Sequence, residues 1–504
     1  MRRRFVLRRK RPNVAVKQNE ECARSAKVKK NDEKRKHMET STQTKQKWIE
    51  KGKELLEGTR AFFNSYLFYA LQTVLACVFV LIQKEVWGAI VFVGLLSIIL
   101  VACEDILPTT LPFLLLCTFT TNCYDSFDTF MAFAIYAPIP AAALIGHFLV
   151  YHKPYKIGES ITGILAVSIA LVLGGIGGFT LKEYASGAYY ILGLGAGMAV
   201  AYLLMKSQFS YRKDYDIREK FSALMVCMGL LCVAMIVIGT VRRLCGWIES
   251  GKGYSLGFSP NNLSTMLMFA MPFPLYFTKK NKLWALLTPL FFGAITMTHS
   301  RGGLLFGAVE LMICCVYWIG EGKHRLARGG LCALAACAFL ACFGRVIISV
   351  IQERLLDDGA TTGGARYQML FQAIDNFVKN PFVGTGILDD SISYAGYRKQ
   401  GTMAWYHMMI PQVVGSMGLV GVAAYAFQAF GRLKLATKKL CRWSVILGIS
   451  YLGILLMSQV NPGEFCPLPF ELLTVLLFIL QEKRLEEETI PLNLAGGLKK
   501  EKKH

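Results

Sequence analysis

Long apolar segments, separated by short polar connections, run along the chain from residue 61 to residue 481. Many approach the ~20 apolar residues that a helix needs to cross a ~30 Å hydrocarbon core. Because backbone groups in lipid must be satisfied internally, these segments are predicted to be helices rather than strands. The segments that fit are residues 61–83, 87–103, 107–122, 129–150, 159–180, 187–206, 220–240, 261–278, 283–299, 301–319, 329–350, 411–430, 443–459 and 467–481. The pattern predicts an all-α fold, a polytopic membrane helical bundle of about 12–14 transmembrane helices.

One polar interruption is much longer than the others and extends from Glu353 to Pro411. Its stretch from Arg366 to Phe377 has helical periodicity. The apolar stripe of this helix consists of Tyr367, Leu370, Phe371, Ile374 and Phe377. We expect the helix to lie on the membrane surface or over the ends of the spans, and to stop at the proline and glycines of residues 380–386. Because loops on a rigid scaffold commonly carry chemistry, the working surface is predicted here.

Basic residues determine the predicted orientation in the membrane. The chain has 56 Lys and Arg residues and a net charge of +22, which in a soluble protein would suggest nucleic acid. Here they gather in the tails and in every second connection, such as those around Lys279 and Arg432, which is the positive-inside pattern. Both termini are therefore predicted to lie in the cytoplasm, with the large loop on the outer face of the cytoplasmic (plasma) membrane. Nucleic acid is not an expected partner.

The tails and the loop divide the chain into six predicted parts. They are a basic cytoplasmic tail (1–60), N-terminal transmembrane helices (61–240), transmembrane helices with outward arginines (241–350), an extracytoplasmic loop with the candidate chemistry (351–410), C-terminal transmembrane helices (411–481) and a second cytoplasmic tail (482–504). The first tail stays polar and basic for too long to be a secretory signal. It is expected to lie near anionic headgroups, so membrane lipids are predicted partners.

Fifteen cysteines are present, and most lie within the apolar segments. Buried free thiols act as small hydrophobic groups. No Cys-x-x-Cys pair with ligand spacing and no nucleotide-binding loop occurs. We therefore expect neither a metal nor a cofactor.

The turn around Arg301 is a first candidate for chemistry. Arg301 begins an apolar segment directly after His299 and Ser300, and Gly302 and Gly303 follow it. An arginine at a helix N-terminus, where glycines let the backbone come close, suits an oxyanion or a phosphate. On spacing alone, the turn could equally be a membrane-interface arginine that ends a tight loop.

A second outward segment joins Arg242 and Arg243 to the start of the next span at Asn261. The two arginines could help to hold an anion. Asn261, or Ser259 before it, could simply cap the helix, because short polar side chains accept hydrogen bonds from the first turn.

The third candidate lies at the far end of the large loop, where Trp405 and His407 precede the span that begins near Pro411. A lone histidine at an interface is usually structural. Here it is predicted to share one face with several arginines, Arg366 among them, which favours a general base.

Four elements follow one another between Arg242 and Tyr425. They are the helix start at Gly257–Asn261, the turn Ser300–Gly303, the Arg366 helix that ends in Asn380–Gly386, and His407 followed by Gly415–Gly421. In this order, and with the large loop on the outer side, the chain resembles the O-antigen ligase and O-antigen polymerase superfamily of bacterial polytopic membrane enzymes of glycan transfer.

The resemblance implies a metal-independent glycosyltransferase of cell-surface polysaccharide biosynthesis. The donor would be a glycan on a polyprenyl diphosphate such as undecaprenyl diphosphate, and the acceptor a hydroxyl of a glycan or glycolipid outside the membrane. It implies that His407 is the general base and that Arg301 holds the diphosphate. The assisting residues would be Arg366, Arg242 and Arg243, with His299, Asn261 and Trp405 as further candidates. Ligase and polymerase remain open alternatives.

The chain departs from the family pattern at three points. Met408 follows the histidine where asparagine is common, the helix start reads Ser259-Pro260-Asn261-Asn262, and fourteen apolar segments exceed the usual twelve or so. These departures bear on the acceptor more than on the reaction class.

Two other function classes fit a basic polytopic chain. A polysaccharide flippase or other transporter would need polar groups near the midplane, for which the candidates are Glu310 and His147. A lipid-linked glycan polymerase of the shape and sporulation type would use an acidic residue of the outer loop. The candidates for that residue are Asp357, Asp358, Asp389 and Asp390.

Overall fold

A computed structural model gives the conformation of the chain. It describes residues 45–82, 84–122, 133–151, 156–179, 193–209, 216–246, 260–321, 324–351, 362–386, 406–461 and 468–486. The chain separates into two units, Met1–Phe62 and Phe63–His504. In the first unit, the described part of the predicted tail is helical and belongs to the helix Lys45–Phe63.

The described residues form helices and no strand, which confirms the all-α prediction. The α-helices of the second unit are α2 (Tyr66–Leu81), α3 (Glu85–Ala102), α4 (Thr110–Asn122), α6 (Pro138–Tyr151), α7 (Ser160–Phe179), α9 (Ala196–Phe209), α10 (Ile217–Leu244), α11 (Pro260–Ala270), α12 (Pro274–Phe277), α13 (Leu287–Met297), α14 (Arg301–Gly320), α15 (Arg325–Ile351), α16 (Thr362–Lys379), α17 (Met409–Thr437), α18 (Arg442–Met457) and α19 (Leu468–Glu486). Short 3-10 turns lie at Leu107–Thr109, Phe133–Tyr136 and Lys282–Leu286.

Each of the fourteen predicted segments overlaps a helix of the structure. Among the described residues, α10, α14 and α17 are long and apolar enough to cross a membrane by length and composition alone, and Lys45–Phe63 with Tyr66–Leu81 makes a fourth if taken as one bent span. Several shorter apolar helices accompany them. The chain is thus an all-α polytopic membrane protein, and the number of its spans stays a prediction.

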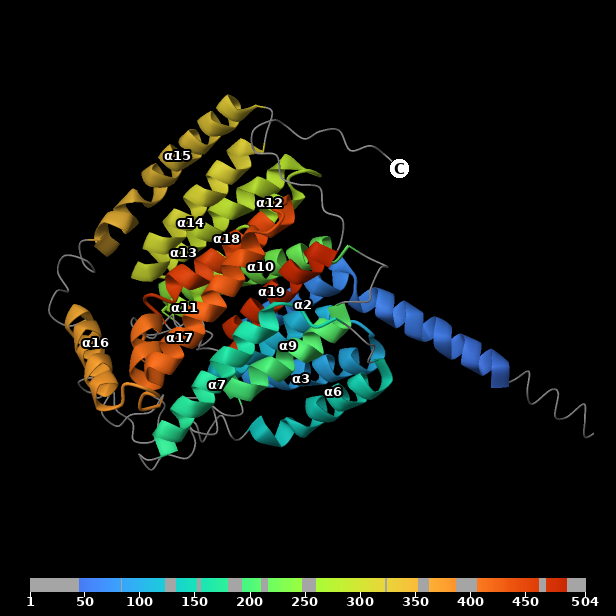
Figure 1. Cartoon of the computed structure of the whole chain (residues 1–504). Coiled ribbons are helices and arrows are strands. Elements are labelled where there is room, and N and C mark those ends of the chain that lie inside the picture. The colour runs from blue at the N-terminus through green and yellow to red at the C-terminus, as the bar shows by residue number, and fades with distance from the viewer. Residues whose placement is uncertain are drawn as a thin grey trace, which may run out of the picture. The chain divides into compact units, whose positions relative to one another are not determined.

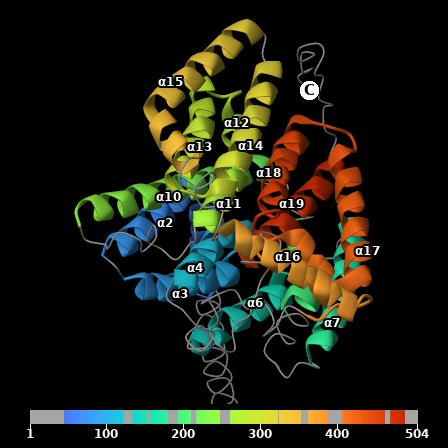
Figure 2. The same cartoon turned by 90° about the vertical axis from the view of Figure 1, so that its left-hand side faces the viewer.

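The largest buried cluster takes residues from α2, α3, α4 and α9 as well as from α10, α11, α13, α14, α18 and α19 (Figure 1). Phe221, Phe273 and Trp443 form its aromatic centre, with ring centroids 5.3–6.3 Å apart. α15 lies at the edge of this group beside α14 (Figures 1 and 2). On the other side, α7 packs along α17, where the backbone at Gly163 closely approaches Gln428.

α16 confirms the prediction of a helix in the large loop, but it packs on a different face. It begins at Thr362, four residues before Arg366, and lies against α17 (Figure 2). Among its described side chains, from residue 369 onward, Met369, Ala373 and Asn376 are buried, whereas Phe371 of the predicted apolar stripe is 67% exposed. Small Ala373 permits the close approach to α17, and Leu370, Phe371 and Ile374 of the apolar stripe remain exposed.

α17 is broken at Gly418, where φ is +58° and ψ is −152°, a conformation that only glycine adopts readily. The break leaves backbone groups unpaired within the helix, and residues 381–386 supply their partners. Thr385 and Gly386 donate to the carbonyls of Gly415 and Ser416 at 3.2 and 3.1 Å. Leu419 and Val420 donate in turn to the carbonyls of Pro381 and Phe382 at 2.8 and 3.0 Å. This exchange anchors the described end of the large loop to α17.

Candidate functional site

The turn before α14 is joined to the start of α11 by hydroxyl groups. Ser300 caps α14, since its Oγ accepts from the N–H of Gly303 at 3.0 Å and donates to Oδ1 of Asn261 at 2.7 Å. Ser264 and Thr298 bond to each other at 2.7 Å just beneath. A Cβ on Gly303 would lie 2.6 Å from Ser264, so this glycine lets the two helices touch. Asn261 therefore supports the turn that carries Arg301.

Arg301 is half-buried at the first position of α14. The N-terminus of a helix carries partial positive charge and favours anions, which adds to the guanidinium charge. His299, also half-buried, has φ of +58°, an uncommon left-handed backbone for a residue with a side chain. The structure thus places His299 and Arg301 on either side of the capping serine.

The turn at the end of α18, Ser458–Asn461, contacts the other candidate elements. The N–H of Met409 donates to the carbonyl of Ser458 at 2.8 Å. Asn461 Nδ2 donates to Oδ1 of Asn262 at 3.0 Å. A Cβ on Gly302 would lie 2.4 Å from Cγ2 of Val460. We call Ser458–Asn461 the hub turn, because the starts of α11, α14 and α17 all meet it.

His407 lies two residues before the contact that Met409 makes with the hub turn. Its side chain is exposed, and its φ of +51° is left-handed. Arg301 lies one residue before Gly302, which rests on the same turn. The structure therefore brings together the segments that carry Arg301, His299, Asn261 and His407.

Arg242 does not share this environment. It is 3% exposed, and its guanidinium donates to the carbonyls of Val80 and Leu81 at the end of α2. A basic side chain on the last carbonyls of a helix is a stabilising arrangement, because that end carries partial negative charge. Its neighbour Arg243 is exposed.

The remaining predicted residues lie partly or wholly outside the described residues. Arg366 belongs to the second turn of α16, but its side chain is not among those described. Trp405 and the acidic candidates of the outer loop, at positions 357, 358, 389 and 390, are outside the described residues altogether.

Sequence reasoning missed several residues that shape this end of the bundle. Asn376 of α16 donates to the hydroxyl of Tyr406 at 2.7 Å, and both side chains are buried. Asn262, Ser458 and Asn461 build the hub turn contacts. The sequence pattern gave little indication of these roles. Asn376 is a polar residue within an amphipathic helix, and such a residue by itself predicts a solvated face.

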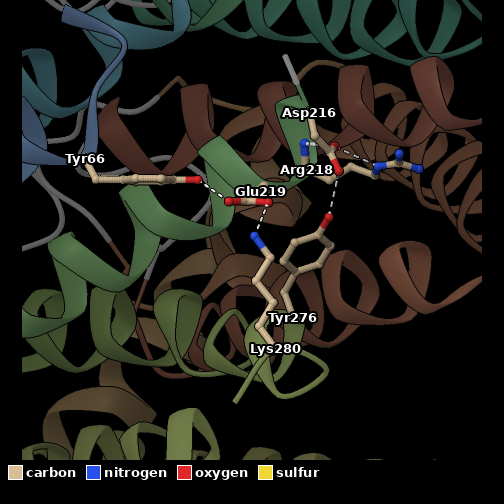
Figure 3. Close-up of polar contacts among 6 residues, drawn as sticks. All are labelled: Tyr66, Asp216, Arg218, Glu219, Tyr276 and Lys280. Carbon is tan, nitrogen blue, oxygen red and sulfur yellow. Dashed lines mark hydrogen bonds and ion pairs between the residues drawn. The ribbon is translucent and has the colours of Figure 1, made fainter. Parts of the chain in front are cut away.

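A second polar cluster lies at the start of α10, the end of that helix away from Arg242, and includes Tyr276 of α12 (Figure 3). Glu219 accepts from the hydroxyl of Tyr66 and pairs with Lys280 at 2.6 Å. Asp216 pairs with Arg218 at 2.9 Å and accepts from the Tyr276 hydroxyl at 2.9 Å. Burial raises the pKa of Asp216, but Arg218 and the Tyr276 hydroxyl lower it more, so the pKa lies below its usual value. These charges have specific partners, which indicates a structural role.

The two midplane candidates of the transporter alternative are both buried. Oxygens of Glu310 have no hydrogen-bond partner among the described residues, and its carboxyl group fills the space that a side chain at Gly453 would take. His147 bonds through Nδ1 to the carbonyl of Leu100 at 2.8 Å. The two side chains belong to separate helices, α14 and α6.

Comparison with known proteins supports the resemblance. Residues 286–426 match the family model described as O-Antigen ligase, which confirms the resemblance to the O-antigen ligase and polymerase superfamily. The matched segment runs from the last residue of the Lys282–Leu286 turn into α17 and contains His299, Arg301, Arg366, Trp405 and His407. Arg242, Arg243 and Asn261 precede it. No curated protein matches the chain.

Proposed function

We propose that this protein, a membrane protein whose residues 286–426 match the O-antigen ligase family, transfers a glycan from a polyprenyl diphosphate carrier to an acceptor hydroxyl outside the cytoplasmic membrane. One observation carries the proposal. The matched segment supplies a cationic helix start at Arg301 and an exposed histidine at His407, and residues close to each of them in the chain, Gly302 and Met409, contact the hub turn of α18.

The chemistry requires one base and a cationic seat for the leaving group. The acceptor oxygen forms a bond to the anomeric carbon, its proton passes to His407, and the bond from that carbon to the diphosphate oxygen breaks. Arg301 and the N-terminus of α14 stabilise the charge that develops on the departing diphosphate. Arginine suits this task because its planar fork binds phosphate oxygens in pairs. The proposal needs no metal.

Arg366 and Arg243 assist Arg301 in the proposal. Arg242 is left out, since its guanidinium binds the carbonyls at the end of α2. His299 is the competing base, because it lies beside Arg301 and is half-buried at the same turn.

Transfer of a lipid-linked glycan to acceptor, measured with purified variants in vesicles, tests the proposal. A general base contributes typically ~10²–10⁴-fold, so His407→Ala should lose about that much transfer while still binding the carrier lipid. Transfer by the native protein should also fall as pH drops through ~6.5, where a model imidazole gains its proton.

His299→Ala is the matched control in the same assay. It removes the imidazole of a second residue with a left-handed backbone, two positions before Arg301. This variant should keep most of the transfer activity. Loss of transfer in His299→Ala, with His407→Ala active, would reassign the base. Flipping of the carrier by the native protein, without transfer, would favour the transporter alternative.

The predicted face of the site can be tested separately. In a background without native thiols, a single cysteine at position 407 should react with an impermeant reagent added outside intact cells. Lys280 is exposed at the opposite end of the bundle. A cysteine in its place should react only after the cells are opened. Labelling of position 280 in intact cells would invert the topology.

Ligase and polymerase differ only in the acceptor. In a deletion strain, loss of glycan chain length would indicate a polymerase. Accumulation of full-length chains on the carrier, with loss of their attachment, would indicate a ligase.

A further inference from the structure

We propose that Tyr406 is a positioning residue, whose buried hydroxyl and main chain hold His407 at the start of α17 and fix it relative to α16. This inference deepens the proposed function and rests on it, because it concerns how His407 is aimed. Because the Tyr406 side chain is fully buried, its effect on transfer would pass through His407.

The side chain of Tyr406 occupies the contact between α16 and α17. Tyr406 is fully buried, and Asn376 is 2% exposed. Asn376 Nδ2 donates to the Tyr406 hydroxyl at 2.7 Å. A Cβ on Gly415 would lie 2.8 Å from that hydroxyl and 3.1 Å from Cα of Ala373. Glycine at 415 therefore makes room for the phenol, and the phenol joins the two helices.

The main chain of Tyr406 is held by a second set of bonds. Its N–H donates to Oε1 of Gln412 at 3.0 Å, and Gln412 Nε2 donates to Oγ of Ser416 at 3.0 Å. Ser416 in turn donates to the carbonyl of Gln412. The helix-capping residue Met408 has no side-chain acceptor for the first turn. Gln412 reaches back from the helix instead and binds the chain before it, as the acidic residue of a capping box does.

These bonds enclose His407 on both sides. Tyr406 is fixed on one side by Asn376 and Gln412, and Met409 is fixed on the other by the carbonyl of Ser458 at 2.8 Å. Between them His407 keeps its left-handed φ of +51°, which costs energy and persists only where the surroundings determine it. The fixed backbone sets the direction in which the exposed His407 side chain leaves the chain.

The same contact connects the histidine with α16. Asn376 lies ten residues after Arg366 on that helix, so the Tyr406 hydroxyl links the segment of the proposed base with the helix that carries a proposed diphosphate ligand. Removing this hydrogen bond should loosen both the backbone at His407 and the approach of α16.

Tyr406→Phe tests the proposal, because it deletes one oxygen and keeps the ring in its place. Misplacement by about 1 Å can cost ~10²-fold, so we expect kcat for transfer to fall by about 10–100-fold, with little change in KM for the carrier lipid. The pH at which transfer is half-maximal should also shift, since the imidazole changes its surroundings. Tyr276→Phe is the matched control: it removes a hydroxyl bonded to Asp216 at the opposite end and should change neither quantity.

Variants of Asn376 keep the test decisive if Tyr406→Phe fails to fold. Asn376→Leu should reduce kcat as Tyr406→Phe does, and the double variant should be no worse than either one, because both remove the same bond. Asn376→Asp can still accept from the phenol and should recover part of the activity. In a His407→Ala background, Tyr406→Phe should have no further effect on kcat.

Two failures can be told apart. If His407→Ala transfers normally, the proposed function has lost its base. If His407→Ala is inactive while folded Tyr406→Phe and Asn376→Leu match the Tyr276→Phe control in kcat and pH dependence, the positioning role is wrong and the base assignment stands.

Discussion

The two ends of the helical bundle are held together by different kinds of contact. At the end with the hub turn, neutral hydroxyls, amides and backbone groups connect α11, α14, α16, α17 and α18. At the opposite end, ion pairs connect the start of α7 with α17, α9 with α19, and the end of α14 with α18, Glu219 of α10 pairs with Lys280, and Arg484 of α19 binds carbonyls near the end of α17. The difference indicates that these helices are joined mainly by neutral groups at the hub-turn end and by charged groups at the opposite end.

The opposite end contains a buried ion pair and a helix cap. Lys206 of α9 lies 3.1 Å from Glu482 of α19, with 1% and 5% of the two side chains exposed. Glu482 also accepts from the Tyr202 hydroxyl at 2.7 Å and from the N–H of Ser160 at 2.7 Å. Arg484 donates to the carbonyls of Leu435 and Lys438 near the end of α17 at 2.8 and 2.7 Å. Each of these charges links two helices.

The largest expected effect is on the free energy of unfolding and comes from the buried ion pair at the opposite end. Lys206→Met removes one partner of the buried pair and leaves the Glu482 carboxylate without its cation, which should cost about 3–5 kcal/mol of unfolding free energy. Thermal unfolding in detergent measures it. The transfer activity of each folded molecule should stay near that of the native protein, and a selective loss of activity would contradict the division between the ends.

Arg301→Ala tests the end of the bundle that contains the hub turn. Loss of one charge-assisted contact to the departing diphosphate should lower transfer by ~10²–10³-fold, with normal amounts of folded protein. Arg301→Lys should recover little, because an ammonium group lacks the fork geometry. Arg218→Ala, at the opposite end, is the control and should retain activity. An Arg301→Ala protein with full transfer would remove this arginine from the site.

The break in α17 predicts a smaller, backbone-based effect. A Cβ at Gly418 would lie 2.5 Å from the carbonyl oxygen of Pro381 at a left-handed φ, so Gly418→Ala should cost about 1–3 kcal/mol of stability, and transfer should fall as the segment 381–386 is displaced. Gly431→Ala is the matched control in the same helix, since nothing lies within 4 Å of its added Cβ. Equal melting temperatures for the two variants would argue against the backbone exchange.

The smallest effect is expected for Lys280→Ala. The lysine side chain is 62% exposed, and exposed ion pairs contribute about 0–1 kcal/mol because water screens them. Both stability and transfer should therefore remain near native values. A large loss of transfer would place function at the opposite end.

Local pattern predicted the helices well. Apolar segments of spanning length mark the buried or lipid-facing helices, and the periodicity from Arg366 to Phe377 located α16 within a few residues of its start. The order of Arg301, Arg366 and His407 also predicted the family, since these motifs lie within short stretches of chain. A single sequence is enough to detect these patterns, because each one involves residues that are only a few positions apart.

The sequence by itself determined an all-α membrane protein and the motif-bearing segments of its candidate site. Only the tertiary structure decided that Arg242 caps α2, that α16 packs through Ala373 and Asn376 rather than through its apolar stripe, and that Tyr406 joins α16 to His407. The physical reason is that a guanidinium, an amide or a phenol can bond to many groups. Its partner is set by which helices pack side by side, and these contacts join residues 30 to 162 positions apart along the chain.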